Sequence, residues 1–126
     1  MTKQTLRNKY IYDKANNQNS IRVLYKKSGQ PPEVRIINNV QNLKKAIIIQ
    51  NLNIIPYEDL FIICKYAKPV LNTSINVFLP LTGICGNLIV VRIDKNKREF
   101  KGLSQEDIIW YSQDLINKSS FNNIQN

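Results

Sequence analysis

The chain has 126 residues, of which 43% are hydrophobic, and it carries a formal net charge of +9. This length and composition favour a single folded domain and argue against an intrinsically disordered chain. Histidine is absent, which excludes the commonest general base, the commonest zinc ligand and the usual partner of a Ser or Cys nucleophile.

The positive charge lies almost entirely in the first third of the chain. Residues 1–45 contain 10 Lys and Arg against 2 Asp and Glu, a net of +8, whereas residues 46–126 contain 8 against 7, a net of +1. A localised positive field attracts polyanions and steers encounters with them. We therefore expect a polyanion-binding surface in the first third.

Residues 1–19 are predicted to form a basic polar arm that is either flexible or a short helix. The arm interleaves cations and aromatic rings at Arg7, Lys9, Tyr10, Tyr12 and Lys14. Such a segment can contact phosphates while its rings stack on bases. A plain solvated tail and a segment that docks onto a protein are the alternatives.

Two short strands are predicted next. In the segment 21–27 apolar and cationic residues alternate, which is typical of a strand, and Arg22, Lys26 and Lys27 extend the basic patch onto it. The segment 33–37 is the second strand, and the five-residue loop between the two predicts a hairpin.

A helix is predicted from Asn39 to about Gln50. Asn39 is suited to cap its first turn. Apolar residues follow at the spacing of one helical face, namely Val40, Leu43, Ile47 and Ile48.

Three further strands are expected, over 52–55 with Pro56 as its stop, over 60–66 at the centre of the sheet, and over 87–94. Residues 70–86 are predicted to be a loop that packs on the core. The segment 95–99 is a polar turn, and a second group of cations gathers there, partly offset by Asp94 and Glu99. Its members are Lys95, Lys97, Arg98 and Lys101.

A closing helix is predicted from Ser104 to about Asn117, with a capping-box-like start. Ile108, Tyr111 and Leu115 form its apolar stripe, which Ile109 and Ile116 widen. Trp110 lies off this stripe. It is either a rim residue that packs on the sheet or an exposed anchor for a partner, since Trp is enriched at binding hot spots.

These elements predict an α+β protein with a four- or five-stranded mixed or antiparallel sheet, two main helices and the basic N-terminal arm. We expect a single domain over residues 20–117 and a polar tail over 118–126. The start of the chain lacks the apolar run of a signal peptide, and no window approaches the ~20 apolar residues of a membrane span. A cytoplasmic protein of a bacterial cell is therefore expected.

Little in the chain predicts chemistry. The carboxylate pairs Glu58-Asp59 and Glu106-Asp107 are adjacent residues, which do not face each other on a helix or a strand. Cys64 and Cys85 match no zinc or redox spacing and suit buried thiols, although a disulfide between them is possible. We predict no enzymatic activity, no metal site and no cofactor.

The chain resembles a family of small uncharacterised proteins, a domain of unknown function, from low-GC bacteria, their phages, plasmids and conjugative elements. The resemblance covers about residues 21–116 and lies in the order of its segments. They are Ile21-Arg22-Val23-Leu24, Pro32-Glu33-Val34-Arg35, the helix 40–48, Ile54-Ile55-Pro56, Leu79-Pro80, Gly86 to Val91, and Phe100-Lys101-Gly102-Leu103-Ser104. Ile49-Gln50-Asn51 replaces a Gly pair expected after the first helix, and the arm is additional. The resemblance implies a fold class and a mobile-element setting, and no catalytic residues.

Our leading hypothesis is a non-enzymatic accessory protein of a phage or mobile element. It would bind a nucleic acid or a nucleoprotein machine, for instance as an inhibitor of a host defence such as CRISPR, as a monomer or a small homo-oligomer. The expected binding residues are Arg7, Lys9, Tyr10, Tyr12, Lys14, Arg22, Lys26, Lys27 and Trp110. The alternative is a protein–protein interaction or structural module that makes no nucleic-acid contact.

Overall fold

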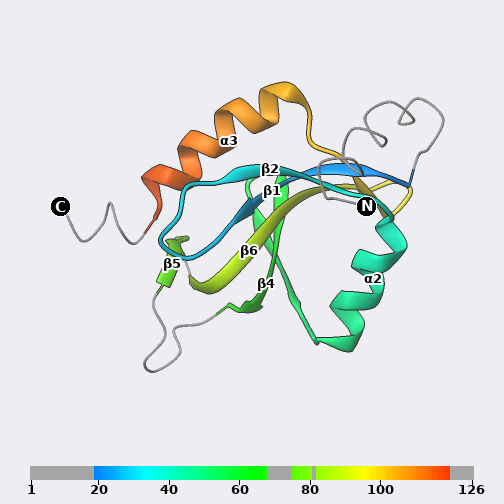
Figure 1. Ribbon diagram of the computed structural model, residues 1–126, viewed down its shortest axis with the longest axis horizontal. Coiled ribbons are helices and arrows are strands. Elements are labelled where there is room, and N and C mark those ends of the chain that lie inside the picture. The colour runs from blue at the N-terminus through cyan, green and yellow to red at the C-terminus, as the bar shows by residue number, and fades with distance from the viewer. Residues whose placement is uncertain (1–18, 68–74, 81, 120–126) are drawn as a thin grey trace, which may run out of the picture.

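A sheet of antiparallel strands forms the centre of the computed structural model, which describes residues 19–67, 75–80 and 82–119 (Figure 1). Seven strands and two helices are present in the described residues, so the protein is α+β. Their bounds are β1 Ile21–Lys26, β2 Glu33–Ile37, α2 Val40–Ile49, β3 Asn53–Tyr57, β4 Leu60–Tyr66, β5 Ile75–Phe78, β6 Gly83–Asp94, β7 Glu99–Lys101 and α3 Gln105–Asn117.

The long strand β6 organises the sheet, whose main path has the order β2-β1-β6-β4-β3. β4 pairs along one side of β6, while β1 pairs opposite residues 88–90 on the other side. β5 pairs with the beginning of β6 and β7 with its end. β2 and β3 are therefore the two edges of the main path.

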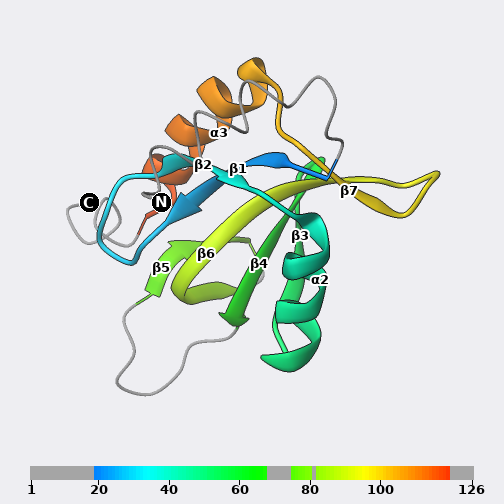
Figure 2. The same ribbon diagram turned by 45° about the vertical axis from the view of Figure 1, so that its right-hand side comes forward.

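The two helices cover opposite faces of this sheet, because side chains alternate between faces along each strand. Tyr111 and Leu115 of α3 pack in one hydrophobic cluster with Leu24 of β1. Val40 and Leu43 of α2 pack in a second cluster, which contains the neighbouring β1 residues Ile21 and Val23. Figures 1 and 2 show α3 and α2 on different sides of the strands. β1 is therefore buried on both faces.

Both predicted helices are confirmed, together with their N-terminal caps. The Asn39 side chain accepts a hydrogen bond from the Gln41 amide at 2.9 Å. Ser104 and Asp107 form a reciprocal capping box at α3, with both bonds at 3.0 Å. These bonds satisfy amides that have no partner within their own helix.

The predicted count of four or five strands is wrong, because β5 and β7 were expected to be loop and turn. β5 has only four residues and β7 only three, so neither shows a clear alternation. β3 also continues through Pro56, the residue predicted to end it. Pro56 is tolerated because β3 is an edge strand, where a missing amide hydrogen leaves no ladder bond unmade.

Two predicted apolar contacts are absent from the core. Ile48 is 79% exposed and Ile109 is 64% exposed, although both were placed on buried stripes. Consecutive helical residues lie about 100° apart, so a run of adjacent apolar residues cannot all face the sheet. Their exposure leaves apolar surface on the outer sides of both helices.

Cys64 and Cys85 are both buried, and no disulfide joins them. Burial raises the pKa of the Cys64 thiol to about 11, and the neighbouring Cys85 adds to the rise. Such a thiol forms little reactive thiolate near neutral pH. Among the described residues, no helix has the length and apolar character needed to cross a membrane.

Candidate nucleic-acid interface

The end of β6 and β7 form a two-stranded hairpin that extends beyond the body of the sheet (Figure 2). Arg92 pairs with Lys101, Ile93 with Phe100, and Asp94 with Glu99. Ile93 and Phe100 are partly buried against the cluster beneath α2. Apolar contacts thus hold the base of the hairpin, while its tip points away from the core.

Asp94 determines the conformation of the tip. Its Oδ1 accepts hydrogen bonds from the amides of Asn96 at 2.9 Å and Lys97 at 3.2 Å. The Lys97 amide is the main cause that lowers the pKa of Asp94, and the Asn96 amide and nearby Lys97 and Lys101 charges contribute. A side chain that bonds to backbone amides two and three residues ahead is a turn-forming device. The carboxylate of Asp94 is therefore engaged with the backbone of the turn.

Four cationic side chains are exposed on this hairpin. They are Lys95, Lys97, Arg98 and Lys101. Within the described part of the chain, none of them makes a close ion pair with a carboxylate. Asp94 and Glu99 are the acidic residues of the segment 94–101, which leaves a local net charge of +2. The hairpin therefore presents cations that are available to an anionic partner.

Arg92 connects the hairpin to the start of α3. Its guanidinium donates to both carboxylate oxygens of Asp107, at 2.8 Å and 3.3 Å. Partial burial opposes ionisation of Asp107, but the bonds from Arg92 and Ser104 outweigh it and hold its pKa below the usual value. Paired, bidentate bonds of this kind fix orientation as well as adding energy.

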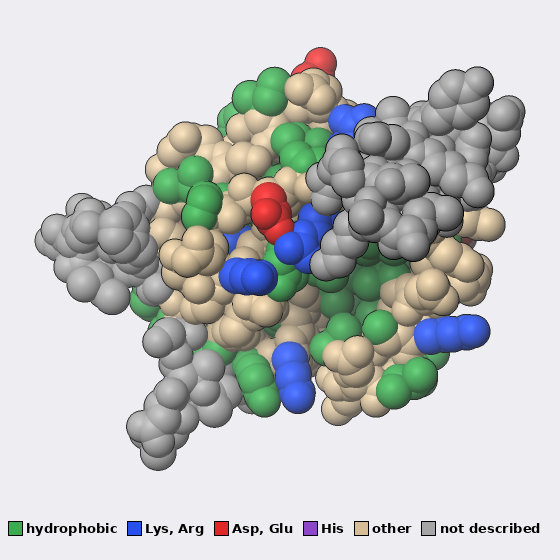
Figure 3. Space-filling view, in the orientation of Figure 1, with side chains coloured by type: hydrophobic (Ala, Val, Ile, Leu, Met, Phe, Trp, Pro, Cys, Tyr) green, Lys and Arg blue, Asp and Glu red, His purple; other side chains and the backbone are tan. Residues whose placement is uncertain are grey.

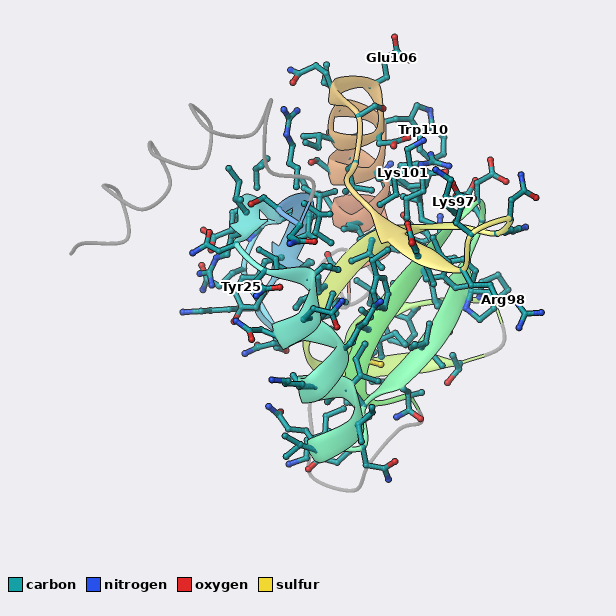
Figure 4. All side chains as sticks on the ribbon, turned by 90° about the vertical axis from the view of Figure 1, so that its right-hand side faces the viewer. Tyr25, Lys97, Arg98, Lys101, Glu106 and Trp110 are labelled. Carbon is teal, nitrogen blue, oxygen red and sulfur yellow. The ribbon has the colours of Figure 1, made fainter. Side chains whose placement is uncertain are left out.

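Trp110 lies one turn after Asp107 on α3, and its side chain is 55% exposed. Its ring meets the ring of Tyr111 edge-on, with centroids 4.9 Å apart. Tyr111 is itself buried in the core cluster. Figure 4 shows Trp110, Lys101 and Lys97 toward the same part of the molecule. Lys101 pairs with Arg92, and Arg92 bonds to Asp107, so the first turns of α3, which carry Trp110, are joined to the base of the hairpin.

Arg22 belongs to the same region. Its guanidinium lies 3.5 Å from Oε1 of Gln105, the first residue of α3, and its carbonyl accepts the Leu103 amide at 2.8 Å. The sequence predicted Arg22 and Trp110 as binding residues, and the structure brings both to the β7–α3 junction. We call this group the basic hairpin surface. Its members are Arg22, Lys95, Lys97, Arg98, Lys101 and Trp110.

Lys26 does not belong to an exposed surface, contrary to the prediction. Only 2% of it is accessible, and its Nζ donates to the side-chain oxygen of Asn76 in β5. The Asn76 amide group donates in turn to the carbonyls of Lys26 and Gly86, at 3.0 Å and 2.8 Å. Burial lowers the pKa of Lys26. The prediction failed because it assumed that one face of β1 is exposed to solvent.

The other predicted binding residues lie elsewhere. Lys27 is exposed at the far end of β1, next to the β1–β2 turn. The arm residues lie outside the described part of the chain. They are Arg7, Lys9, Tyr10, Tyr12 and Lys14.

Several of the described carboxylates have structural partners. Asp114 accepts hydrogen bonds from the Tyr57 hydroxyl and, at 2.8 Å, from Lys118 Nζ. Asp94 and Asp107 are engaged as described above. No group of three or more His, Cys, Asp or Glu that could hold a metal ion gathers within residues 19–67, 75–80 and 82–119.

The substitution Asp107→Asn is expected to lower the free energy of unfolding by about 1–2 kcal/mol at pH 7, because it weakens the cap and the Arg92 bond. The folded pKa of Asp107 is depressed. Its stabilisation is therefore full above the unfolded value of about 3.9 and is lost as pH falls through the folded pKa. Urea unfolding at pH 7 and near pH 3 tests this.

The control for that measurement is Glu106→Gln, which removes the adjacent, exposed carboxylate. It should change stability by no more than about 0.5 kcal/mol. An equal loss for Asp107→Asn at both pH values would contradict the role given to the ionised carboxylate.

Comparison of the chain with protein-family models, with curated proteins and with solved structures finds no match. The resemblance to the uncharacterised mobile-element family therefore remains a prediction.

Proposed function

We propose that the protein binds nucleic acid, alone or within a nucleoprotein complex, through the basic hairpin surface and without catalysing a reaction. The observation that carries the proposal is the projecting β6–β7 hairpin, whose exposed cations have no close carboxylate partner in the described residues. Binding would release counterions from the phosphate backbone as the lysines and Arg98 approach it.

The shape of the hairpin supports this proposal. A two-stranded β-ribbon fits the major groove of a DNA duplex, where its side chains reach base edges and phosphates. On a single strand, an exposed indole such as that of Trp110 can stack on a base, and the cations can follow the backbone. The fixed turn at Asp94 presents Lys95 and Lys97 without a large ordering cost.

A phage or mobile-element accessory protein, for instance an inhibitor of host defence, would use such a surface to occupy or mimic a contact of a nucleoprotein machine. This setting follows from the family resemblance of residues 21–116. The absence of histidine and the structural roles of Asp94, Asp107 and Asp114 support a protein without catalysis.

A protein–protein interaction module is the second candidate, because Ile109 and Trp110 leave adjacent apolar surface on α3. Large exposed apolar side chains that adjoin one another are typical of partner sites. In this case, partner binding would be lost on Trp110→Ala and would depend little on salt.

Fluorescence anisotropy with a generic DNA duplex and a single-stranded RNA, at low and moderate salt, tests the proposal. We expect binding that weakens steeply as salt rises. The full chain is compared with a chain that begins at Ser20, which measures the contribution of the arm. Absence of binding to both probes at low salt would contradict the proposal.

Lys26→Met is expected to leave nucleic-acid affinity and its salt dependence unchanged within about twofold, because a side chain with 2% exposure contacts no phosphate. Met preserves most of the apolar stem that packs in the core. The same titration measures the effect. A clear loss of affinity in a variant that retains the native circular dichroism spectrum would place Lys26 at the interface after all.

A further inference from the structure

A polar hollow lies at the turn end of the β1–β2 hairpin, away from the basic hairpin surface. Its volume is about 370 Å³, which falls in the lower part of the range of small-molecule sites. Figure 3 shows acidic and cationic side chains adjoining one another on the face that carries β1 and β2. The hollow is lined by Tyr25, Lys27, Gln30, Pro31, Glu33 and Arg35.

Three of these residues contact one another. Glu33 pairs directly with Tyr25 across the two strands, and Arg35 is two residues further along β2. The guanidinium carbon of Arg35 lies 3.9 Å from the centre of the Tyr25 ring. Its Nε donates to Glu33 at 2.7 Å, and the two side chains also form an ion pair. The plane of the guanidinium is therefore held by the ring below it and the carboxylate beside it.

The side chain of Arg35 is nevertheless 38% exposed. An aromatic ring can stack on a guanidinium plane, and nucleobases are bound in this way in many proteins. The Tyr25–Arg35 stack is already assembled, so a base would not have to order the side chain. The structure thus presents a planar cationic platform.

The β1–β2 turn places two further polar groups at the hollow. The Gln30 amide donates to the Lys27 carbonyl at 3.0 Å, and Gly29 takes the positive φ of 79° that the turn requires. The Ser28 amide is bonded to Asn87 of β6 at 3.3 Å. Lys27 contributes a cation, and the Gln30 side chain can both donate and accept a hydrogen bond.

We propose that this hollow binds a nucleoside phosphate. The base stacks on the Arg35 guanidinium, the side-chain amide of Gln30 bonds to its edge, and Lys27 binds the phosphate. Lys27 and Arg35 against Glu33 leave a local charge of +1, which suits an anionic ligand. The ligand is either a free nucleotide or one unit of a single-stranded polynucleotide. The site shares no residue with the basic hairpin surface, so it does not depend on the function proposed there.

The test is an NMR titration of the full ¹⁵N-labelled chain that follows the backbone amides and the Arg Nε–H signals. The probes are adenosine, AMP, inorganic phosphate and a short oligo-deoxyadenylate. We expect AMP to shift the signals of Tyr25, Gln30 and Arg35. Because the shifts identify the residues that respond, failure at the hollow is distinguishable from failure at the β6–β7 hairpin.

Two variants separate the base from the phosphate. Arg35→Lys keeps the charge but removes the plane, and should weaken AMP about tenfold while leaving phosphate unaffected. Lys27→Gln should weaken AMP and phosphate but not adenosine. Lys45→Gln, which removes an exposed charge on α2, is the matched control and should change nothing.

The oligonucleotide distinguishes the two sources of the ligand. If the oligo-deoxyadenylate binds much more tightly than AMP and shifts the signals of the same hollow residues, the ligand is a single-stranded polynucleotide. If the two bind with equal affinity, the ligand is a free nucleotide. Absence of AMP-induced shifts at millimolar concentration would overturn the proposal. So would shifts confined to other residues, or AMP binding that Arg35→Lys does not weaken.

Discussion

The triple variant Lys95→Gln/Lys97→Gln/Arg98→Gln is expected to lose most of the salt-dependent affinity of the protein for nucleic acid. These three exposed cations occupy the tip of the β6–β7 hairpin. Each phosphate contact contributes about 0.9 to the slope of log affinity against log salt. Removing three phosphate contacts should lower this slope by about 2.7. Raising salt from about 50 to 200 mM should therefore reduce the affinity of the wild type about 40-fold more than that of the variant.

The matched control is Lys44→Gln/Lys45→Gln/Lys65→Gln, which lies on α2 and β4. Both triple variants have a net charge of +6, three less than the original +9. The control should keep nearly the full salt slope, because only long-range attraction changes. If both variants lose the same affinity, binding depends on net charge and not on the hairpin.

Leu115→Ala is expected to lower the free energy of unfolding by about 2–5 kcal/mol. Leu115 is fully buried and packs in the cluster that joins α3 to the sheet. Truncating it leaves a cavity at that contact, in addition to removing the transfer energy of the lost methyl groups. Urea unfolding followed by far-ultraviolet circular dichroism measures the loss.

The same helix supplies the control, because Ile109 is 64% exposed. Ile109→Ala removes a side chain of similar size and should change stability by no more than about 0.5 kcal/mol. Comparable losses of stability for the two variants would contradict the orientation of α3, in which Leu115 faces the sheet and Ile109 faces solvent.

Both helices could be predicted closely because their signals are local. Asn39 and Ser104 mark the starts, and the buried residues recur at helical spacing. The strands β1, β2 and β4 were predicted for a similar reason. The prediction failed at β5 and β7, since a strand of three or four residues depends on its partner β6 and not on its own pattern.

The site could be predicted only in part. The sequence shows the cluster of Lys95, Lys97, Arg98 and Lys101. It also shows Asp94 and Glu99, whose negative charges partly offset that cluster. What the sequence does not show is that Asp94 binds the backbone of its own turn. Nor does it show that Asp107 anchors the hairpin through Arg92, because that contact joins residues 15 positions apart.

Lys26 shows the limit of alternation as a guide to exposure. A period of two in the sequence shows which residues share a face of a strand, but it does not show which face meets solvent. Helices cover both faces of β1, and the partner of Lys26 is Asn76, 50 residues later in the chain. Arg22 follows the same alternation as Lys26, yet remains partly exposed because it lies at the N-terminal end of α3.

Nucleic-acid binding by the β6–β7 hairpin is tested most directly by chemical-shift mapping of the ¹⁵N-labelled protein with a short DNA duplex at low salt. We expect the largest shifts at residues 94–101 and at the Trp110 indole, and we expect them to diminish as salt is raised. Shifts that leave the β6–β7 hairpin unaffected and gather at another surface would contradict the assignment of this hairpin as the nucleic-acid interface.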